Sequence, residues 1–277
     1  MGGKSVVVAV FERCFFVYFC KMIDNLKDLR DWLDYGLAQY NRIEFIQNDP
    51  ISIPHLFTQK EDIEISAFFV SLIAWGKRTS IIRSGKKLML LMDHAPADFI
   101  RNHRPQDLKR FESFVYRTLN GSDIQFFISA LQKIYLEAGG LETAFSIQGE
   151  NESAYHAIDR FRQLLFSLEH EMRAEKHIGN PSKNSACKRL NMYLRWMVRY
   201  DEQGVDFGIW KTILPAQLIC PLDVHTARVA RKLNLLSRKQ NDRKAAEELT
   251  RNLSYICALD PVKYDFALFG AGINGLL

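Results

Sequence analysis

The sequence has little cysteine, and its cysteines are scattered. The five stand at positions 14, 20, 187, 220 and 257, and no two have the Cys-x-x-Cys spacing of a zinc or redox site. An odd number without such spacing argues against a disulfide framework, a structural zinc and an iron–sulfur cluster. We therefore expect a protein of a reducing compartment, the cytoplasm, with no metal and no other cofactor.

Long apolar runs are missing as well. The most apolar stretch, residues 6–20, is interrupted by Glu12 and Arg13, so neither half is long enough to span a membrane. The small residues of a signal-peptide cleavage site are also missing before Met22. We interpret Met22 as a natural start, residues 1–21 as a weakly structured apolar extension ahead of it, and residues 22–277 as a single unit.

Sustained strand alternation, internal repeats and low-complexity tracts are absent, whereas helical periodicity recurs from Met22 onward. Hydrophobic residues make up 47% of the chain, which is enough for one large domain or two intimate ones. The expected fold class is all-α, with helices packed around one or two small cores. Helices are expected at residues 26–37, 61–75, 79–92, 93–100, 122–136, 153–172, 185–200, 223–236, 243–253 and 262–270.

The charge balance is mildly basic. Lys and Arg number 37 against 32 Asp and Glu, which gives a formal net charge of +5. Such a balance is compatible with a polyanionic partner, and equally with an ordinary solvated surface. Charge alone therefore does not choose between these two readings.

Asp223 carries the most chemical information in the sequence. It lies in the segment PLDVHTARVAR, residues 221–231, after a proline-led extended stretch and directly before an amphipathic helix. This is an N-cap position, so the residue either only caps the helix or also directs a carboxylate into a cleft. His225, just inside the helix, is expected to be a structural hydrogen-bond donor, because no second ligand stands at a metal-like spacing from it.

Four segments of the chain, in order, resemble the helix-hairpin-helix DNA glycosylases of the endonuclease III type. Residues 65–78 (ISAFFVSLIAWGKR) are similar to the apolar helix that lines the base pocket of those enzymes, and residues 188–194 (KRLNMYL) to the helix after their hairpin. The pattern D-x-H-x-x-R-V-x-x-x-L at residues 223–233 resembles the helix with their catalytic aspartate, and residues 264–273 (YDFALFGAGI) their closing helix. The whole sequence also looks like a member of a bacterial family known only as a domain of unknown function.

The resemblance implies a DNA repair glycosylase of two intimate helical lobes that acts as a monomer on double-stranded DNA. Its substrate would be a damaged base such as oxidised guanine. Asp223 would stabilise the positive charge that builds on the sugar as the N-glycosidic bond breaks. Lys188, near a helix start and beside Arg189, is the candidate amine nucleophile of an AP-lyase step. From the residues alone, a plain N-cap at Asp223 and a solvated side chain at Lys188 stay open as alternatives.

An extruded base needs aromatic side chains on which to stack. Trp75 is the best candidate for such a wall, because Gly76 beside it allows backbone to approach a ligand. Phe68, Phe69 and Trp196 are further wall candidates, although large apolar residues at helical spacing more often belong to a core.

The phosphates of a nucleic acid need cations. Arg195 and Arg199 are four residues apart, so they share a helix face, with Lys188 near the same line and no acid among residues 188–199. This pattern indicates an anionic ligand. The candidate substrate- and DNA-binding residues are Trp75, Lys77, Arg78, Arg195, Arg199, His225 and Arg228.

The chain departs from the glycosylase pattern just before Lys188. The usual hairpin, L-P-G-x-G, is replaced by residues 178–185 (IGNPSKNS), and the span from Lys188 to Asp223 is long, as in archaeal 8-oxoguanine glycosylases. Two other functions therefore stay open. One is a nucleic-acid-binding helical module that keeps the fold without the chemistry. The other is a cytosolic scaffold whose basic face binds proteins.

Overall fold

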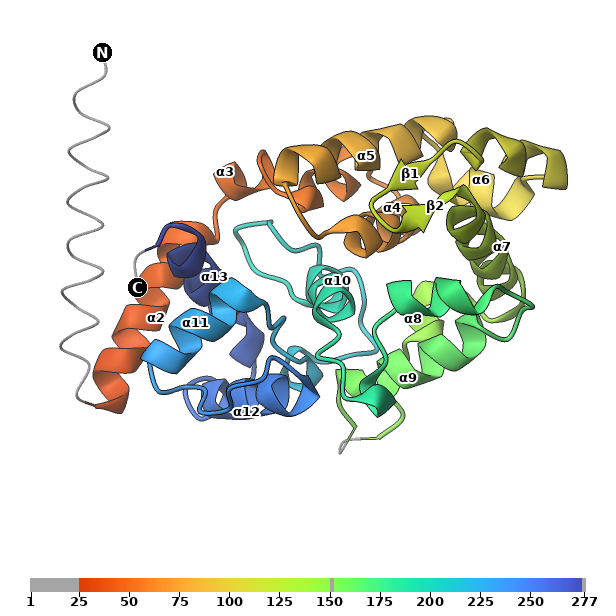
Figure 1. Ribbon diagram of the computed structural model, residues 1–277. Helices are drawn as coiled ribbons and strands as arrows, with labels where there is room; N and C mark the ends of the chain where they lie inside the picture. The colour runs from red at the N-terminus through yellow and green to blue at the C-terminus, as the bar shows by residue number, and fades with distance from the viewer. Residues whose placement is uncertain (1–24, 150–151, 276–277) are drawn as a thin grey trace, which may run out of the picture.

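The computed structural model describes residues 25–149 and 152–275, so the predicted extension at residues 1–21 lies outside the described residues. The described chain consists of helices and one short antiparallel strand pair (Figure 1). This confirms the all-α fold class that helical periodicity predicts. None of the helices in these two ranges is long and apolar enough to cross a lipid bilayer.

The helices follow one another through the chain with mostly short connections. The α-helices are α2 (Leu26–Tyr40), α3 (Ile43–Ile46), α4 (Lys60–Ile73), α5 (Arg78–Leu91), α6 (Pro96–Asn102), α7 (Gly121–Glu137), α8 (Leu141–Ala144), α9 (Ala154–Leu165), α10 (Lys188–Val198), α11 (Val224–Lys232), α12 (Arg243–Ser254) and α13 (Asp265–Ile273). The 3-10 helices are η1 (Pro50–Ser52), η2 (Pro54–Leu56), η3 (Pro105–Phe111), η4 (Met172–His177), η5 (Pro181–Lys183), η6 (Pro215–Gln217) and η7 (Pro261–Tyr264). The strands are β1 (Val115–Tyr116) and β2 (Leu119–Asn120).

Two groups of helices lie on either side of α10 (Figure 1). In the first group, α4 packs against α5, α6 and α10, and α7 packs against α6, α8 and α9. In the second group, α13 packs against both α2 and α11, and η7 contacts both α12 and α2. The first and last α-helices of the described chain are therefore direct neighbours.

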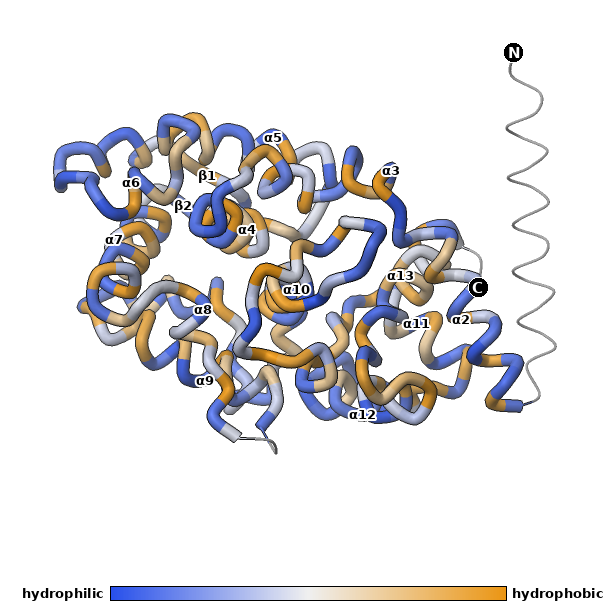
Figure 2. Tube along the Cα trace, turned by 180° about the vertical axis from the view of Figure 1, so that it is seen from behind, coloured by the Kyte–Doolittle hydropathy of each residue, from blue (hydrophilic) through white to orange (hydrophobic). Residues whose placement is uncertain are grey.

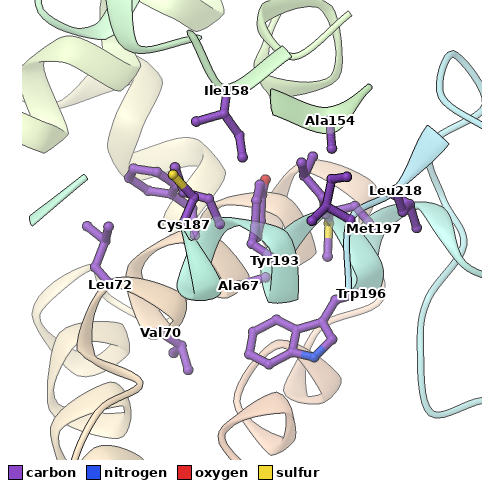
Figure 3. Packing of buried hydrophobic residues seen from close by; sticks show 14 of the residues in the cluster. Ala67, Val70, Leu72, Ala154, Ile158, Cys187, Tyr193, Trp196, Met197 and Leu218 are labelled. Atoms are coloured by element: carbon purple, nitrogen blue, oxygen red, sulfur yellow. The ribbon is translucent and has the colours of Figure 1, made fainter. Parts of the chain in front are cut away.

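One hydrophobic core extends through both groups of helices. Helix α4 is buried on almost every side, which explains why its sequence is apolar all round. Its fully buried Phe68 contacts the rings of Phe127 and Tyr193 edge-on. Figure 2 shows hydrophobic stretches on α4 and α10 in the middle of the molecule, and Figure 3 shows Tyr193 and Trp196 among buried side chains. Phe68 and Phe69 are thus core residues, not walls of a ligand site.

Three helices are shorter than the sequence predicts. One is α11, predicted over residues 223–236, which ends at Lys232 ahead of the left-handed Asn234, with φ of 57°. Instead of one helix over residues 153–172, α9 ends at Leu165, and the rings of Phe166 and His170 stack on Phe126 of α7. The helix predicted at residues 185–200 begins only at Lys188, because Cys187 before it is left-handed, with φ of 49°. A right-handed helix does not continue through such a residue.

Arg195 and Arg199, on α10, are buried among carboxylates. Asp206 accepts hydrogen bonds from both, from Nε of Arg195 at 3.3 Å and from Nη1 of Arg199 at 3.1 Å. Nη1 of Arg195 also pairs with Asp265 at 2.5 Å. Both guanidinium groups lie over the ring of Phe266, at 4.3 and 5.5 Å from its centre. We call the two arginines and their carboxylates the α10 ion network; its carboxylates are Asp201, Asp206, Asp260 and Asp265.

The α10 ion network corrects one prediction. Arg195 and Arg199 do not form an acid-free face for an anionic ligand, because carboxylates from the following loop, from the start of η7 and from α13 neutralise them. Burial alone would lower the pKa of Arg195, but Asp206 and Asp265 raise it. Both arginines are charged residues of the interior.

The α10 ion network predicts a large cost for removing Asp206. Asp206→Ala leaves two buried guanidinium groups without their shared carboxylate, so we expect the free energy of unfolding to fall by ~3–5 kcal/mol. Glu61→Ala is the control, because it breaks the exposed ion pair with Arg101 and should cost less than ~1 kcal/mol. Urea unfolding followed by circular dichroism measures both costs, and equal values would contradict the prediction.

Candidate functional site

A cleft of about 520 Å³ opens where η1, the α4–α5 loop, α10, the start of α11 and α13 meet. Residues from both groups of helices line it. This volume is within the range of ligand pockets in proteins, roughly 300–1,000 Å³. The predicted site residues that line the cleft are Trp75, Arg78, Lys188, Arg195, Asp223 and His225.

Asp223 is the N-cap of α11 and also lines the cleft. Its Oδ1 accepts hydrogen bonds from the backbone N–H groups of His225 at 2.8 Å and Thr226 at 2.9 Å. Within residues 25–149 and 152–275, no hydrogen bond involves its Oδ2. The predicted cap is confirmed. The two readings of this aspartate are compatible, because one oxygen caps the helix and leaves the other available.

Lys188 is the first residue of α10 and lies in the wall of the cleft. Its Nζ is 3.9 Å from the sulfur of Met192, one turn further along the helix. The neighbouring Arg189 donates hydrogen bonds to the carbonyl groups of Leu72 and His177. Arg189 therefore fixes the start of α10 against α4, and the position of Lys188 follows from this anchoring.

Two buried carboxyl groups in the cleft, Asp49 and Asp265, are absent from the sequence prediction. Burial raises the pKa of Asp265 to about 6; the charge of Arg195 opposes this shift and that of Asp223 adds to it. Burial also raises the pKa of Asp49, and the N–H of Ile51 opposes the shift. The charge of Lys188 lowers the pKa of both carboxyls, so these groups share one electrostatic environment.

Weak signals for both carboxyls exist in the sequence. Asp49 directly precedes Pro50, an arrangement typical of a helix start, and its side chain caps η1. Asp265 is the only charged residue in an otherwise apolar closing helix. A lone acid in such a helix is either paired or functional.

His225 and Arg228 connect α11 to α13. Nδ1 of His225 donates a hydrogen bond to the carbonyl of Gly272 at 3.3 Å, and Arg228 donates to the same oxygen at 2.6 Å. A Cβ atom at Gly272 would lie 2.8 Å from that of His225, so only glycine permits this close packing. His225 thus has the structural donor role that its position predicts, toward α13.

Three of the predicted binding residues do not line the cleft. Lys77 is exposed, Arg228 holds α13, and Arg199 belongs to the α10 ion network. Trp75 is at the mouth of the cleft with 36% of its surface exposed, whereas Trp196 is a buried part of the wall. The structure therefore brings Asp223, Lys188 and Trp75 together in the cleft. The predicted cations Lys77, Arg199 and Arg228 lie outside it.

The segment that replaces the glycine-rich hairpin is a compact turn. The Asn180 side chain caps η5, the backbone N–H of Ser185 donates to the Asn180 carbonyl, and Asn184 is left-handed with φ of 61°. A Cβ at Gly179 would come within 2.9 Å of the sulfur of Cys187. The turn thus closes directly onto the residue that precedes Lys188, which fixes the entry into α10.

The fold and the cleft define an all-α protein with a charged cleft between two groups of helices. The chain belongs to the family described as "Protein of unknown function (DUF2400)", whose profile matches residues 49–274. That range includes every residue that lines the cleft except Phe45. In the comparisons with curated proteins and with solved structures, nothing matches the chain. No cluster of three or more metal-ligating side chains occurs in the part of the chain that the structure describes.

The double role of Asp223 predicts different results for two substitutions. Asp223→Ala removes the oxygen that accepts from His225 and Thr226, so the free energy of unfolding should fall by about 1 kcal/mol. Asp223→Asn keeps an equivalent oxygen and should change it by only a few tenths. Urea unfolding of the three proteins measures the difference. A cost for Asn as large as that for Ala would show that the charge, and not the cap, stabilises α11.

Asp265 predicts a pH dependence of stability. Its pKa is raised in the folded protein, to about 6, so folding favours its protonated form. Its contribution to the free energy of unfolding is therefore fully present below the ordinary pKa of an aspartate, about 3.9. We expect this contribution to be lost as the pH rises through about 6. Urea unfolding between pH 4 and pH 7 should show a decline in the wild type that Asp265→Asn lacks; identical pH profiles would contradict the assignment.

Proposed function

We propose that the protein is a DNA glycosylase that excises a damaged base, with oxidised guanine as the expected substrate, and that Lys188 adds an AP-lyase step. It would act as a monomer on double-stranded DNA in the cytoplasm. One observation carries the proposal: the capping carboxylate of Asp223 and the amine of Lys188, from separate helices, line the same cleft.

Asp223 is suited to stabilise a cation. As an N-glycosidic bond breaks, positive charge builds on the sugar ring, and a nearby carboxylate lowers the energy of that state. Two backbone N–H groups hold Oδ1 of Asp223, so the carboxylate needs little reorganisation when the charge develops. Its Oδ2, which has no partner in the described part of the chain, is the oxygen left for this interaction.

Lys188 supplies the group that a lyase step needs. Its unprotonated amine would attack C1′ of the sugar as the bond from C1′ to the base breaks, and the proton that the amine then loses would go to the departing base. The C1′–O4′ bond would open next, with O4′ taking a proton from water, to give a Schiff base, and β-elimination of the 3′ phosphate would break the strand. The anchoring of Arg189 to two backbone carbonyls supports this role, because it keeps the helix start and its lysine in one place. Lys77 and Arg228 lie outside the cleft and are candidates for contacts with the flanking phosphates.

Borohydride trapping on duplexes that each hold one lesion tests the proposal. With 8-oxoguanine, we expect base release and a covalent protein–DNA adduct, and Lys188→Gln should abolish the adduct. Asp223→Asn should reduce base release at least ~100-fold, because the charge is lost while the cap is kept. Cleavage is measured on denaturing gels, with unfolding curves as the control for folding.

The outcomes separate the three functions that the sequence leaves open. Base release without a trapped adduct would restrict the enzyme to glycosylase activity. Salt-dependent duplex binding without cleavage of any lesion would contradict catalysis and favour the nucleic-acid-binding module. Absence of duplex binding at low salt would leave a scaffold for protein partners.

A further inference from the structure

Trp75 is the only tryptophan with a substantially exposed surface. It is 36% exposed at the mouth of the cleft, whereas Trp32, Trp196 and Trp210 are each exposed by 1% or less. A single exposed aromatic side chain is common at protein surfaces, so it is the place of Trp75 in the cleft lining that marks it as a candidate contact. The contacts that hold this ring come from the β1–β2 hairpin.

The β1–β2 hairpin holds Trp75 through two residues. The guanidinium of Arg117, in the turn of the hairpin, lies 4.4 Å from the centre of the Trp75 ring. The hydroxyl of Tyr116 donates a hydrogen bond to the carbonyl of Trp75 at 2.6 Å, and the two rings meet edge-on. Trp75 lines the cleft, whereas Arg117 is not among the residues that line it.

The backbone on both sides of this contact is arranged to permit it. Gly76 has a φ of +110°, and a Cβ atom there would lie 2.6 Å from Nη2 of Arg117. Glycine is therefore required for the guanidinium to reach the indole. Arg117 itself is left-handed, with φ of 54°, a conformation that residues with side chains rarely adopt. Two unusual backbone positions thus converge on one cation–π contact.

We propose that Arg117 is a positioning residue that holds Trp75 upright as a stacking wall for a purine base. This inference rests on the proposed function, in which an extruded base occupies the cleft. A guanidinium on one face of an indole draws π electrons toward that face and leaves the other face less negative. The cleft side of Trp75 then suits an electron-rich ring, and guanine and its oxidised forms are the most electron-rich bases.

Tryptophan fluorescence in the full-length protein tests this role. Acrylamide, a neutral quencher, should reach only Trp75, so Trp75→Phe should lose the quenchable signal. Guanosine should protect Trp75 from acrylamide at concentrations at which cytidine does not. Arg117→Met should weaken guanosine binding about five-fold, because the indole must then be ordered when the ligand binds, and should increase the quenching of Trp75. Arg117→Lys keeps the charge and should restore most of the binding.

Lys87→Met is the matched control. It removes the same charge and another cation–π contact, with Phe114, 5.8 Å from the ring centre and outside the cleft, so guanosine binding should not change. Guanosine affinity within two-fold of wild type in Arg117→Met would overturn the proposal, as would equal protection by cytidine. If Arg117→Met unfolds, Arg117→Gln, which keeps a polar side chain without the charge, replaces it under the same two-fold criterion. Guanosine stacking in a protein that cleaves no lesion would overturn the proposed function and leave this inference standing.

Discussion

The interaction on which the rest of the structure depends is the α10 ion network. Arg195 lies on the central helix and pairs with Asp206 from the following loop and Asp265 from α13. Charges this deeply buried are stable only when they are fully paired, so the network fixes α10 relative to α13. Asp265 belongs to both the network and the cleft. The electrostatics of the cleft are therefore set by core packing as well as by the residues at its surface.

Asp223 shows how stability and chemistry can share one side chain. Its Oδ1 completes the hydrogen bonds of the α11 start, and this same bonding orients the carboxylate in the cleft. Because two backbone N–H groups hold its Oδ1, the carboxylate keeps its orientation when no ligand is bound. In the proposed enzyme, Asp223 would therefore be oriented before substrate binds.

The sequence predicts residues with local signals and misses those that only tertiary contacts define. The Asp223 cap and the helix after Lys188 follow from the few residues around them. Arg195 and Arg199 are misread because a helix-face pattern covers only the helix itself, whereas their carboxylates all lie outside α10: two in the loop after it, and Asp260 and Asp265 61 and 70 positions further along from their arginines. The sequence marks Asp265 only as a lone acid in an apolar helix; its burial and its pairing with Arg195 come from tertiary contacts. The C-terminal end of α9 and the start of α10 differ from the prediction because aromatic stacking and a left-handed cysteine override helix propensity.

Helix α13 packs against α2, although more than 200 residues separate them in the chain. During synthesis, the apolar face of α2, including Trp32 and Leu33, is made long before its partner exists. The helices from α4 to α10 make their contacts largely with one another, so this part can fold before synthesis of the chain is complete. The apolar face of α2 lacks this partner until α13 has been synthesised. In that interval it is an exposed apolar surface that chaperones can shield.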